Sequence, residues 1–309
     1  MLGPEIQPVA PGAERGPVAR GKSLVNRAFH RTADLILRVD RSQTLNRDRS
    51  PMAGGGDIAA ELYGAVQMMK AEAFDPSGGG VDYRRLCESE TYQQYRACTA
   101  GLINFDPATL SSNEQRLAFW INLYNALIID AVIAFDLKGS IREDLGFFRR
   151  AAYVIGGQRY SADDIEHGIL RGNRRHFHPM IPFPQFAPGD VRLAYSLPKV
   201  DLRLHSALVC ASRSCPPIAV YAAGRIHQQL DVAAANFVNN GGAVVDVPAG
   251  RLNLSPIFRW YRRDFGGTPG VIDFVESHLD DGPGREFLRA RGSRLNLVYQ
   301  TYDWSLNGL

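Results

Sequence analysis

The sequence predicts an α+β fold in a single domain, with helices packed on a small, mostly antiparallel sheet. Helical patterns gather in the first half of the chain, and short strand patterns interleave with helices in the second half. No regular alternation of strand and helix appears, which argues against a doubly wound parallel sheet. With 309 residues, 45% of them hydrophobic, the chain can bury a substantial core and needs no disulfide or structural metal to fold.

The N-terminal 56 residues differ in composition from the rest. Residues 1–56 are rich in Pro, Gly and Arg and end in a Gly-Gly-Gly run, so we expect a flexible arm here. One part of the arm has apolar residues near helical spacing among arginines, which indicates a short basic amphipathic helix. These residues are Leu24, Ala28, Leu35 and Ile36. The helix is expected to pack on its own domain or to contact a membrane surface or another protein. Residues 57–309 are expected to form one α+β domain.

Capping and turn residues place the main elements. Ser111 and Ser112 precede Glu114 and Gln115 by three residues, a capping-box pattern that begins a long apolar helix. Gly156-Gly157 predicts the turn of a β-hairpin. The other expected helices cover 57–73, 89–102, 163–171, 224–239 and parts of 256–290. The other expected strands cover 191–195, 202–210, 243–247, 251–254 and 295–301.

Charge and composition exclude several classes of function. A formal charge of +3 without a Lys/Arg block gives no basis for nucleic-acid binding. No uninterrupted apolar run of about 18 residues predicts a transmembrane segment. Four cysteines in a chain of this length are not a disulfide scaffold, so the expected location is the cytoplasm. Neither Gly78-Gly79-Gly80 nor Gly266-Gly267 lies in the strand–turn–helix context of a phosphate-binding loop, and no cofactor is expected.

Four segments resemble a known family. They are Asn113–Ala126 (NEQRLAFWINLYNA), Ile165–Arg171 (IEHGILR), Arg203–Pro217 (RLHSALVCASRSCPP) and Tyr302–Asn307 (YDWSLN). In order and spacing they resemble the family called domain of unknown function 547, and together they span residues 113–307. The resemblance implies no agreed substrate. Ser206 stands where the family usually has an aromatic residue, and Ala211-Ser212-Arg213 stands where small residues and a lysine commonly precede the Ser-Cys-Pro.

The third segment carries the leading candidates for chemistry. If residues 202–210 form a strand, His205 and Arg203 share one face and Cys210 lies on the other. Cys215 lies beyond the strand and can return to the face of His205. Pro216 favours a helix start at Cys215, where partial positive charge would lower the pKa of the thiol. We therefore expect Cys215 to be a nucleophile and His205 to be its general base.

Other polar residues could complete this site. Asn122 and Asn125 fall on one side of the long helix, and one of them could orient His205 as in Cys–His–Asn enzymes. The alternative is that both amides bind the backbone of a neighbouring loop. Arg203 is expected to bind a substrate carboxylate or phosphate, and Trp120 is expected to contribute to substrate binding.

The sequence therefore favours a thiol-dependent hydrolase or acyltransferase that acts on an unidentified small molecule or peptide. A permuted papain-like core would place the histidine before the cysteine, as here. A non-catalytic binding or scaffold module is the first alternative. The second is a structural zinc domain with the ligand spacing H-x4-C-x4-C, formed by His205, Cys210 and Cys215. Alternation along the expected strand disfavours this set, and no metal site is expected.

Overall fold

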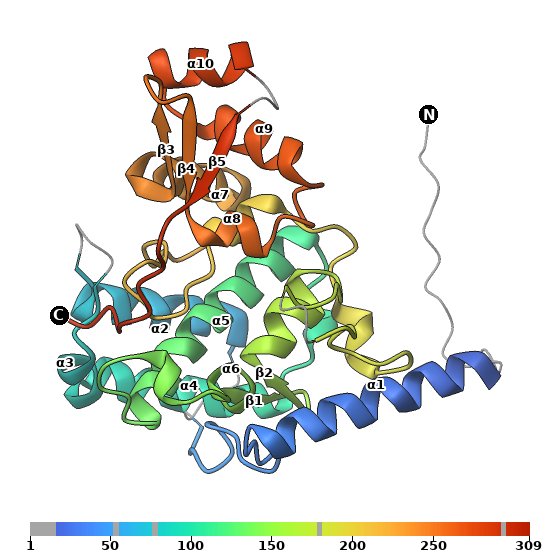
Figure 1. Ribbon diagram of the computed structural model, residues 1–309. Coiled ribbons are helices and arrows are strands. Elements are labelled where there is room, and N and C mark those ends of the chain that lie inside the picture. The colour runs from blue at the N-terminus through green and yellow to red at the C-terminus, as the bar shows by residue number, and fades with distance from the viewer. Residues whose placement is uncertain (1–16, 52–55, 76–79, 178–180, 292–294) are drawn as a thin grey trace, which may run out of the picture.

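The structure, a computed structural model, describes residues 17–51, 56–75, 80–177, 181–291 and 295–309. Helices dominate, and the α+β class is confirmed. Figure 1 shows a broad lower part crossed by a long central helix, a narrower upper part that carries the C-terminal strands, and one long helix along the base. The helices of the lower part are α1 (Pro17–Ile36), α2 (Ile58–Ala73), α3 (Tyr83–Glu88), α4 (Glu90–Gly101), α5 (Asn113–Ala134) and α6 (Phe147–Arg150).

Helix α5 is the centre of the main core. Ser112 and Gln115 form the expected capping box at its start, which satisfies backbone N–H groups of the first turn. Sixteen consecutive residues, Leu117–Val132, are buried, so the helix is surrounded on all sides. Its length and composition alone would let it cross a membrane, but its side chains fill the protein core instead.

Two small sheets stand where a single sheet was expected. Strands β1 (Ala152–Ile155) and β2 (Gln158–Ser161) form the hairpin with the Gly156-Gly157 turn. The second sheet has the order β3 (Ala243–Asp246), β4 (Arg251–Leu254) and β5 (Asn296–Tyr299), with an antiparallel and then a parallel pair. It packs with α7 (Ile226–Phe237), α8 (Pro256–Trp260), α9 (Thr268–His278) and α10 (Pro283–Arg291) around a second hydrophobic cluster.

Two strand predictions are wrong. Val191–Tyr195 and Leu202–Ser206 are 3-10 helices. Each follows an aspartate whose side chain accepts a hydrogen bond from the second backbone N–H of the turn: Asp190 before the first and Asp201 before the second. Such capping competes with an extended backbone. The predicted alternation of faces around His205 therefore does not exist. The expected helix start at Cys215 is also wrong, because residues 216–222 are irregular.

Residues 17–51, expected within a flexible arm, pack against the body. The side chain of Asn46 is buried and bonds to the backbone of Thr99 and Val154. Arg49 forms a buried bidentate ion pair with Asp130 of α5. The preceding helix α1 lies along the base of the molecule (Figure 1). The structure thus fixes this part of the chain through specific polar contacts rather than through a core of its own.

Candidate functional site

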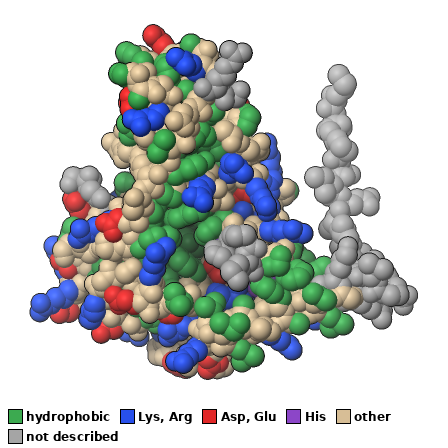
Figure 2. All heavy atoms as spheres, in the orientation of Figure 1, with side chains coloured by type: hydrophobic (Ala, Val, Ile, Leu, Met, Phe, Trp, Pro, Cys, Tyr) green, Lys and Arg blue, Asp and Glu red, His purple; other side chains and the backbone are tan. Residues whose placement is uncertain are grey.

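A cavity of about 650 Å³ lies where distant parts of the chain converge. Its walls are mostly aliphatic and aromatic, and Figure 2 shows an apolar hollow at the centre of the molecule. The apolar walls come from α1, α5, α6, α8 and the C-terminal segment, and include Phe29, Ile36, Leu145, Phe148, Leu208, Ile257, Trp260 and Trp304. The polar lining consists of Arg149, Asp163, Glu166, His167, His176 and His205, with Tyr124, Tyr261 and Tyr302. An apolar cavity with few convergent polar groups is the usual form of a small-molecule site.

Glu166 is held at the base of the cavity by two tyrosines. It belongs to the short helix expected over residues 163–171, which spans Asp164–Leu170 and is π-helical. Tyr124 donates a hydrogen bond to Glu166 Oε2 at 3.0 Å, and Tyr261 donates one to Oε1 at 2.5 Å. Burial and the nearby carboxylate raise the pKa of both tyrosines well above the ordinary value, so both remain donors.

Asp264 links His205 to Arg171. Its Oδ2 lies 3.2 Å from Nε2 of His205, a contact at ion-pair distance whose alignment falls short of a straight hydrogen bond. Arg171 donates from Nε and Nη2 to the two oxygens of the same carboxylate, at 2.7 and 3.1 Å. Burial opposes ionisation of Asp264, but His205 and Arg171 outweigh it and lower its pKa. The carboxylate is therefore charged and fixed in place.

His205 is neutral and rigidly oriented. Burial lowers its pKa below the ordinary value, and Asp264 offsets this only in part. The ring stacks on Tyr261 with centroids 4.0 Å apart. Because Asp264 faces Nε2, the proton of the neutral ring belongs on Nε2 and the lone pair on Nδ1. No hydrogen bond to Nδ1 occurs within the described residues, so its lone pair is available to accept a proton.

Cys210 and Cys215 form a disulfide on the cavity wall. The backbone N–H of Cys210 lies 2.9 Å from Cys215 Sγ, and the hydroxyl of Tyr302 lies 3.2 Å from both sulfurs. These N–H and O–H groups would stabilise negative charge on sulfur once the disulfide is reduced. The other two cysteines are free: Cys87 is exposed and Cys98 is buried.

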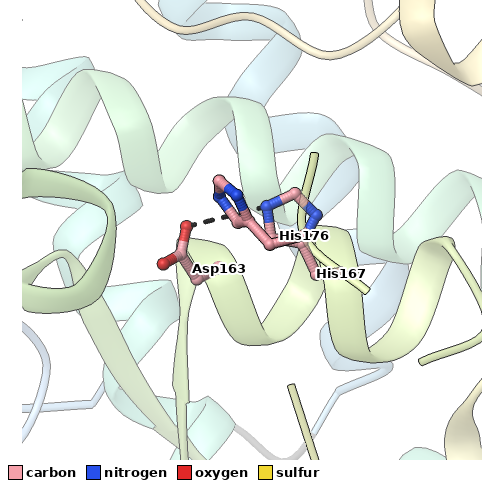
Figure 3. Close-up of side chains that lie close together, drawn as sticks. All are labelled: Asp163, His167 and His176. Carbon is pink, nitrogen blue, oxygen red and sulfur yellow. Dashed lines mark ion pairs between the residues drawn. The ribbon is translucent and has the colours of Figure 1, made fainter. Parts of the chain in front are cut away.

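Asp163, His167 and His176 are the only group of possible metal ligands within the described residues, with ligand atoms within 4.8 Å of one another (Figure 3). Their protonation pattern disfavours a metal. Arg171, which can only donate, lies 2.7 Å from Nδ1 of His167, so the ring proton belongs on Nε2, the nitrogen that faces Asp163 at 4.0 Å. A metal would need that nitrogen unprotonated. The zinc set of His205 with both cysteines is not among the possible ligand groups of the described residues.

A model of the family described as "Protein of unknown function, DUF547" matches residues 107–238. The chain resembles the DUF547 family. No curated protein and no solved structure matches it. The matched residues include Glu166, His167, Arg171, His205 and both cysteines of the disulfide, whereas Tyr261, Asp264 and Tyr302 lie beyond the match. The cavity thus combines the DUF547 segment with α1 and with the C-terminal part of the chain.

The structure brings together some of the predicted site residues and separates others. His205 and Cys215 line the same cavity. Within the described residues, Asn122 and Asn125 form no hydrogen bond with His205. Asn122 bonds to the backbone of Tyr221, and Asn125 bonds to the backbone of Ala207 and Val209, so both amides bind neighbouring loops. The loop at Ala207 and Val209 precedes the Cys210–Cys215 disulfide in the chain, and the loop at Tyr221 follows it.

Two residues expected to bind substrate lie elsewhere. Arg203 forms ion pairs with Asp201 and Asp231, so its charge is already balanced away from the cavity. Trp120 is fully buried in the main core against Phe119 and Tyr160. It cannot touch a substrate because the helix that carries it is surrounded by other side chains.

Asp264 is the main residue that sequence reasoning missed. It lies far along the chain from His205, in a turn between α8 and α9, and no local pattern marks it. The one signal in the sequence is Arg171 at the end of the segment Ile165–Arg171, because an arginine that becomes buried needs a carboxylate partner. Asp264 is that partner.

Proposed function

We propose that this chain is a thiol-dependent hydrolase or acyltransferase, with Cys215 as nucleophile and His205 as general base. The observation that carries the proposal is that Cys215 and His205 line one cavity while Asp264 holds the ring of His205. Carboxylate, imidazole and thiol then take the roles of a catalytic triad. Asp264 replaces the asparagines as the group that orients the histidine.

The disulfide must be reduced before this chemistry can begin. A dithiol reductant supplies two electrons and two protons to the Cys210–Cys215 disulfide. The two cysteines become thiols, and the reductant is oxidised to a disulfide. Nδ1 of His205 then accepts the proton of Cys215, and the charge of Asp264 stabilises the imidazolium. The hydroxyl of Tyr302 and the backbone N–H of Cys210 lie beside the sulfur and favour the thiolate.

The acyl transfer has two steps. The thiolate attacks the substrate carbonyl carbon, the bond to the leaving group breaks, and the imidazolium of His205 gives its proton to that group. Water or an acceptor hydroxyl or amine then attacks the thioester, gives its proton to His205 and releases Cys215. Water makes the protein a hydrolase, and an acceptor makes it an acyltransferase. The apolar walls favour a substrate with an apolar acyl or aromatic group.

Acyl-enzyme formation on the reduced protein tests the proposal. Nitrophenyl esters of different acyl chain lengths serve as probes, and the mass of the intact protein and of its peptides locates any adduct. We expect an acyl group on Cys215 in the wild type and in Cys87→Ser, whose cysteine is exposed and outside the cavity. No adduct should form in Cys215→Ser. Full turnover by folded Cys215→Ser protein would overturn the proposal.

The cavity-lining disulfide favours a second candidate, a thiol–disulfide oxidoreductase. Cys210→Ser separates the two. An oxidoreductase loses activity because its second sulfur is gone. A thiol hydrolase keeps its activity and no longer needs a reductant, because Cys215 has no partner within the pair.

A further inference from the structure

Helix α1 is attached to the body through polar side chains. The buried residues of its inner face follow helical spacing: Ser23, Asn26, His30 and Asp34. Asn26 and His30 both reach the carbonyl oxygen of Pro184 at 2.9 Å. Asp34 pairs with the buried guanidinium of Arg149 at 2.7 Å. The face that a surface helix usually fills with apolar residues is polar here.

The opposite face of α1 is apolar and open. Leu24, Ala28, Arg31 and Leu35 follow the spacing i, i+4, i+7 and i+11, so they form one outward stripe. Leu24 is 65% exposed and Leu35 is 79% exposed. A row of apolar side chains along α1 is visible at the lower right of Figure 2. The apolar face of the helix is therefore exposed to solvent and does not pack on the protein.

This apolar surface continues into the cavity. Ile36 and Leu145 both line the cavity, yet they are 74% and 82% exposed. They consequently form an apolar mouth next to the stripe. Phe29 and Ala33, from the inner side of the same helix, continue the apolar wall inward.

The charge around the stripe is positive. Arg27, Arg31 and Arg38 are exposed, and Asp34 is the one acidic residue between Gly21 and Val39. Asp34 is buried and already paired with Arg149, so it does not neutralise this surface. An outward apolar face bordered by arginines has the composition of helices that lie in the interface of anionic bilayers.

We propose that α1 docks the protein on an anionic lipid bilayer and that the cavity mouth opens there to admit the acyl chain of a lipid-borne substrate. The docking is independent of catalysis, whereas the choice of substrate rests on the proposed acyl-transfer function. A second copy of the chain is a poorer occupant of this surface. A symmetric pairing through α1 would bring the arginines of both copies toward one another.

Flotation of the full-length protein with vesicles tests the docking. Phosphatidylcholine vesicles containing phosphatidylserine should carry the protein upward, and vesicles of phosphatidylcholine alone should carry much less. Higher salt should lower the bound fraction because it screens the arginines. Leu35→Glu should reduce binding about tenfold or more, since it places a charge in the apolar stripe. Val244→Glu, at a half-exposed position on the distant strand β3, is the matched control.

Two further results decide the proposal. Cys215→Ser should bind vesicles as the wild type does, so a failure of the catalytic proposal leaves the docking result intact. Equal flotation of wild type and Leu35→Glu, with both proteins folded by circular dichroism, would overturn the docking. So would a dimer in light scattering that Leu35→Glu dissociates, together with no binding to the phosphatidylserine vesicles.

Discussion

Asp264 Oδ2 lies 3.2 Å from Nε2 of His205, although the two residues are far apart in the sequence. This contact defines the tautomer of the imidazole and leaves Nδ1 as the nitrogen that can accept a proton. Arg171 holds the same carboxylate from the other side. The chemistry proposed for the cavity depends on this arrangement more than on any other contact.

Asp264→Asn should slow acylation of Cys215 by about 10²-fold or more, because the amide cannot stabilise the imidazolium and can favour the wrong tautomer. Asp264 is a positioning residue, so kcat should fall while KM changes little. The measurement is the pH profile of acyl-enzyme formation by the variant and the wild type. A thermal melt must accompany it because Arg171 also loses a charged partner. Unchanged kcat in a folded variant would remove Asp264 from the mechanism.

Asp163→Asn should stabilise the protein at pH 8 by an amount on the order of 1–4 kcal/mol. Burial raises the pKa of Asp163 to about 7, above its ordinary value of 3.8. The folded protein therefore binds a proton that the unfolded chain releases, and wild-type stability is lost as the pH rises from about 4 through 7. Urea unfolding should show the gain at pH 8 and little gain below pH 4. Glu88→Gln, at an exposed carboxylate, is the control and should leave the free energy of unfolding unchanged at both pH values. A loss of stability at pH 8 would mean that ionised Asp163 is well accommodated.

Asn125→Ala should destabilise the fold by about 2–4 kcal/mol. The amide bonds to the carbonyl of Ala207 at 2.9 Å and to the N–H of Val209 at 3.1 Å, and all these groups are buried. Truncation leaves both backbone groups without their partner in the loop that leads to Cys210. Equilibrium unfolding in urea measures the cost. Asn240→Ala, at an exposed position, should change stability by less than about 0.5 kcal/mol. Equal effects of the two substitutions would mean that the hydrogen bonds of Asn125 do not stabilise this loop.

Gly168→Ala should destabilise the protein by about 1–3 kcal/mol. A Cβ at Gly168 would lie 2.3 Å from the ring of Phe186, which is itself buried, so the π-helical segment or the ring would have to move. Gly64→Ala in α2 is the matched substitution. Its Cβ would meet no atom within 4 Å, and a gain of about 0.5–1 kcal/mol is expected from helix propensity. Differential scanning calorimetry should show melting temperatures that move in opposite directions.

Local signals in the sequence predicted the elements that depend on local contacts. The capping box at Ser112 and Gln115 is a pattern of adjacent residues, as is the Gly156-Gly157 turn, and both are confirmed. Asp190 and Asp201 were equally local signals, but the apolar residues after them resembled strands. The capping aspartates outweigh that pattern because each also holds the arginine two residues later.

The site was less predictable because its contacts join distant segments. Cys215 and His205 could be proposed from one motif. The partner of His205 could not, because Asp264 and Tyr261 enter the cavity from a turn far along the chain. The sequence also does not predict that α1 packs through its polar face. Asn26 and His30 face inward because they bond to the carbonyl oxygen of Pro184, which is distant in the chain.

The pH dependence of Cys215 alkylation in the reduced, native protein shows whether this thiol is activated, with each cysteine followed by mass spectrometry. We expect rapid alkylation of Cys215 near pH 7, where an ordinary thiol with a pKa of about 8.5 is mostly protonated. His205→Gln should slow it markedly, while the alkylation rate of the exposed Cys87 should be the same in both proteins. If Cys215 reacts no faster than Cys87, or reacts only after unfolding, the thiol is not activated and Cys215 is not the nucleophile.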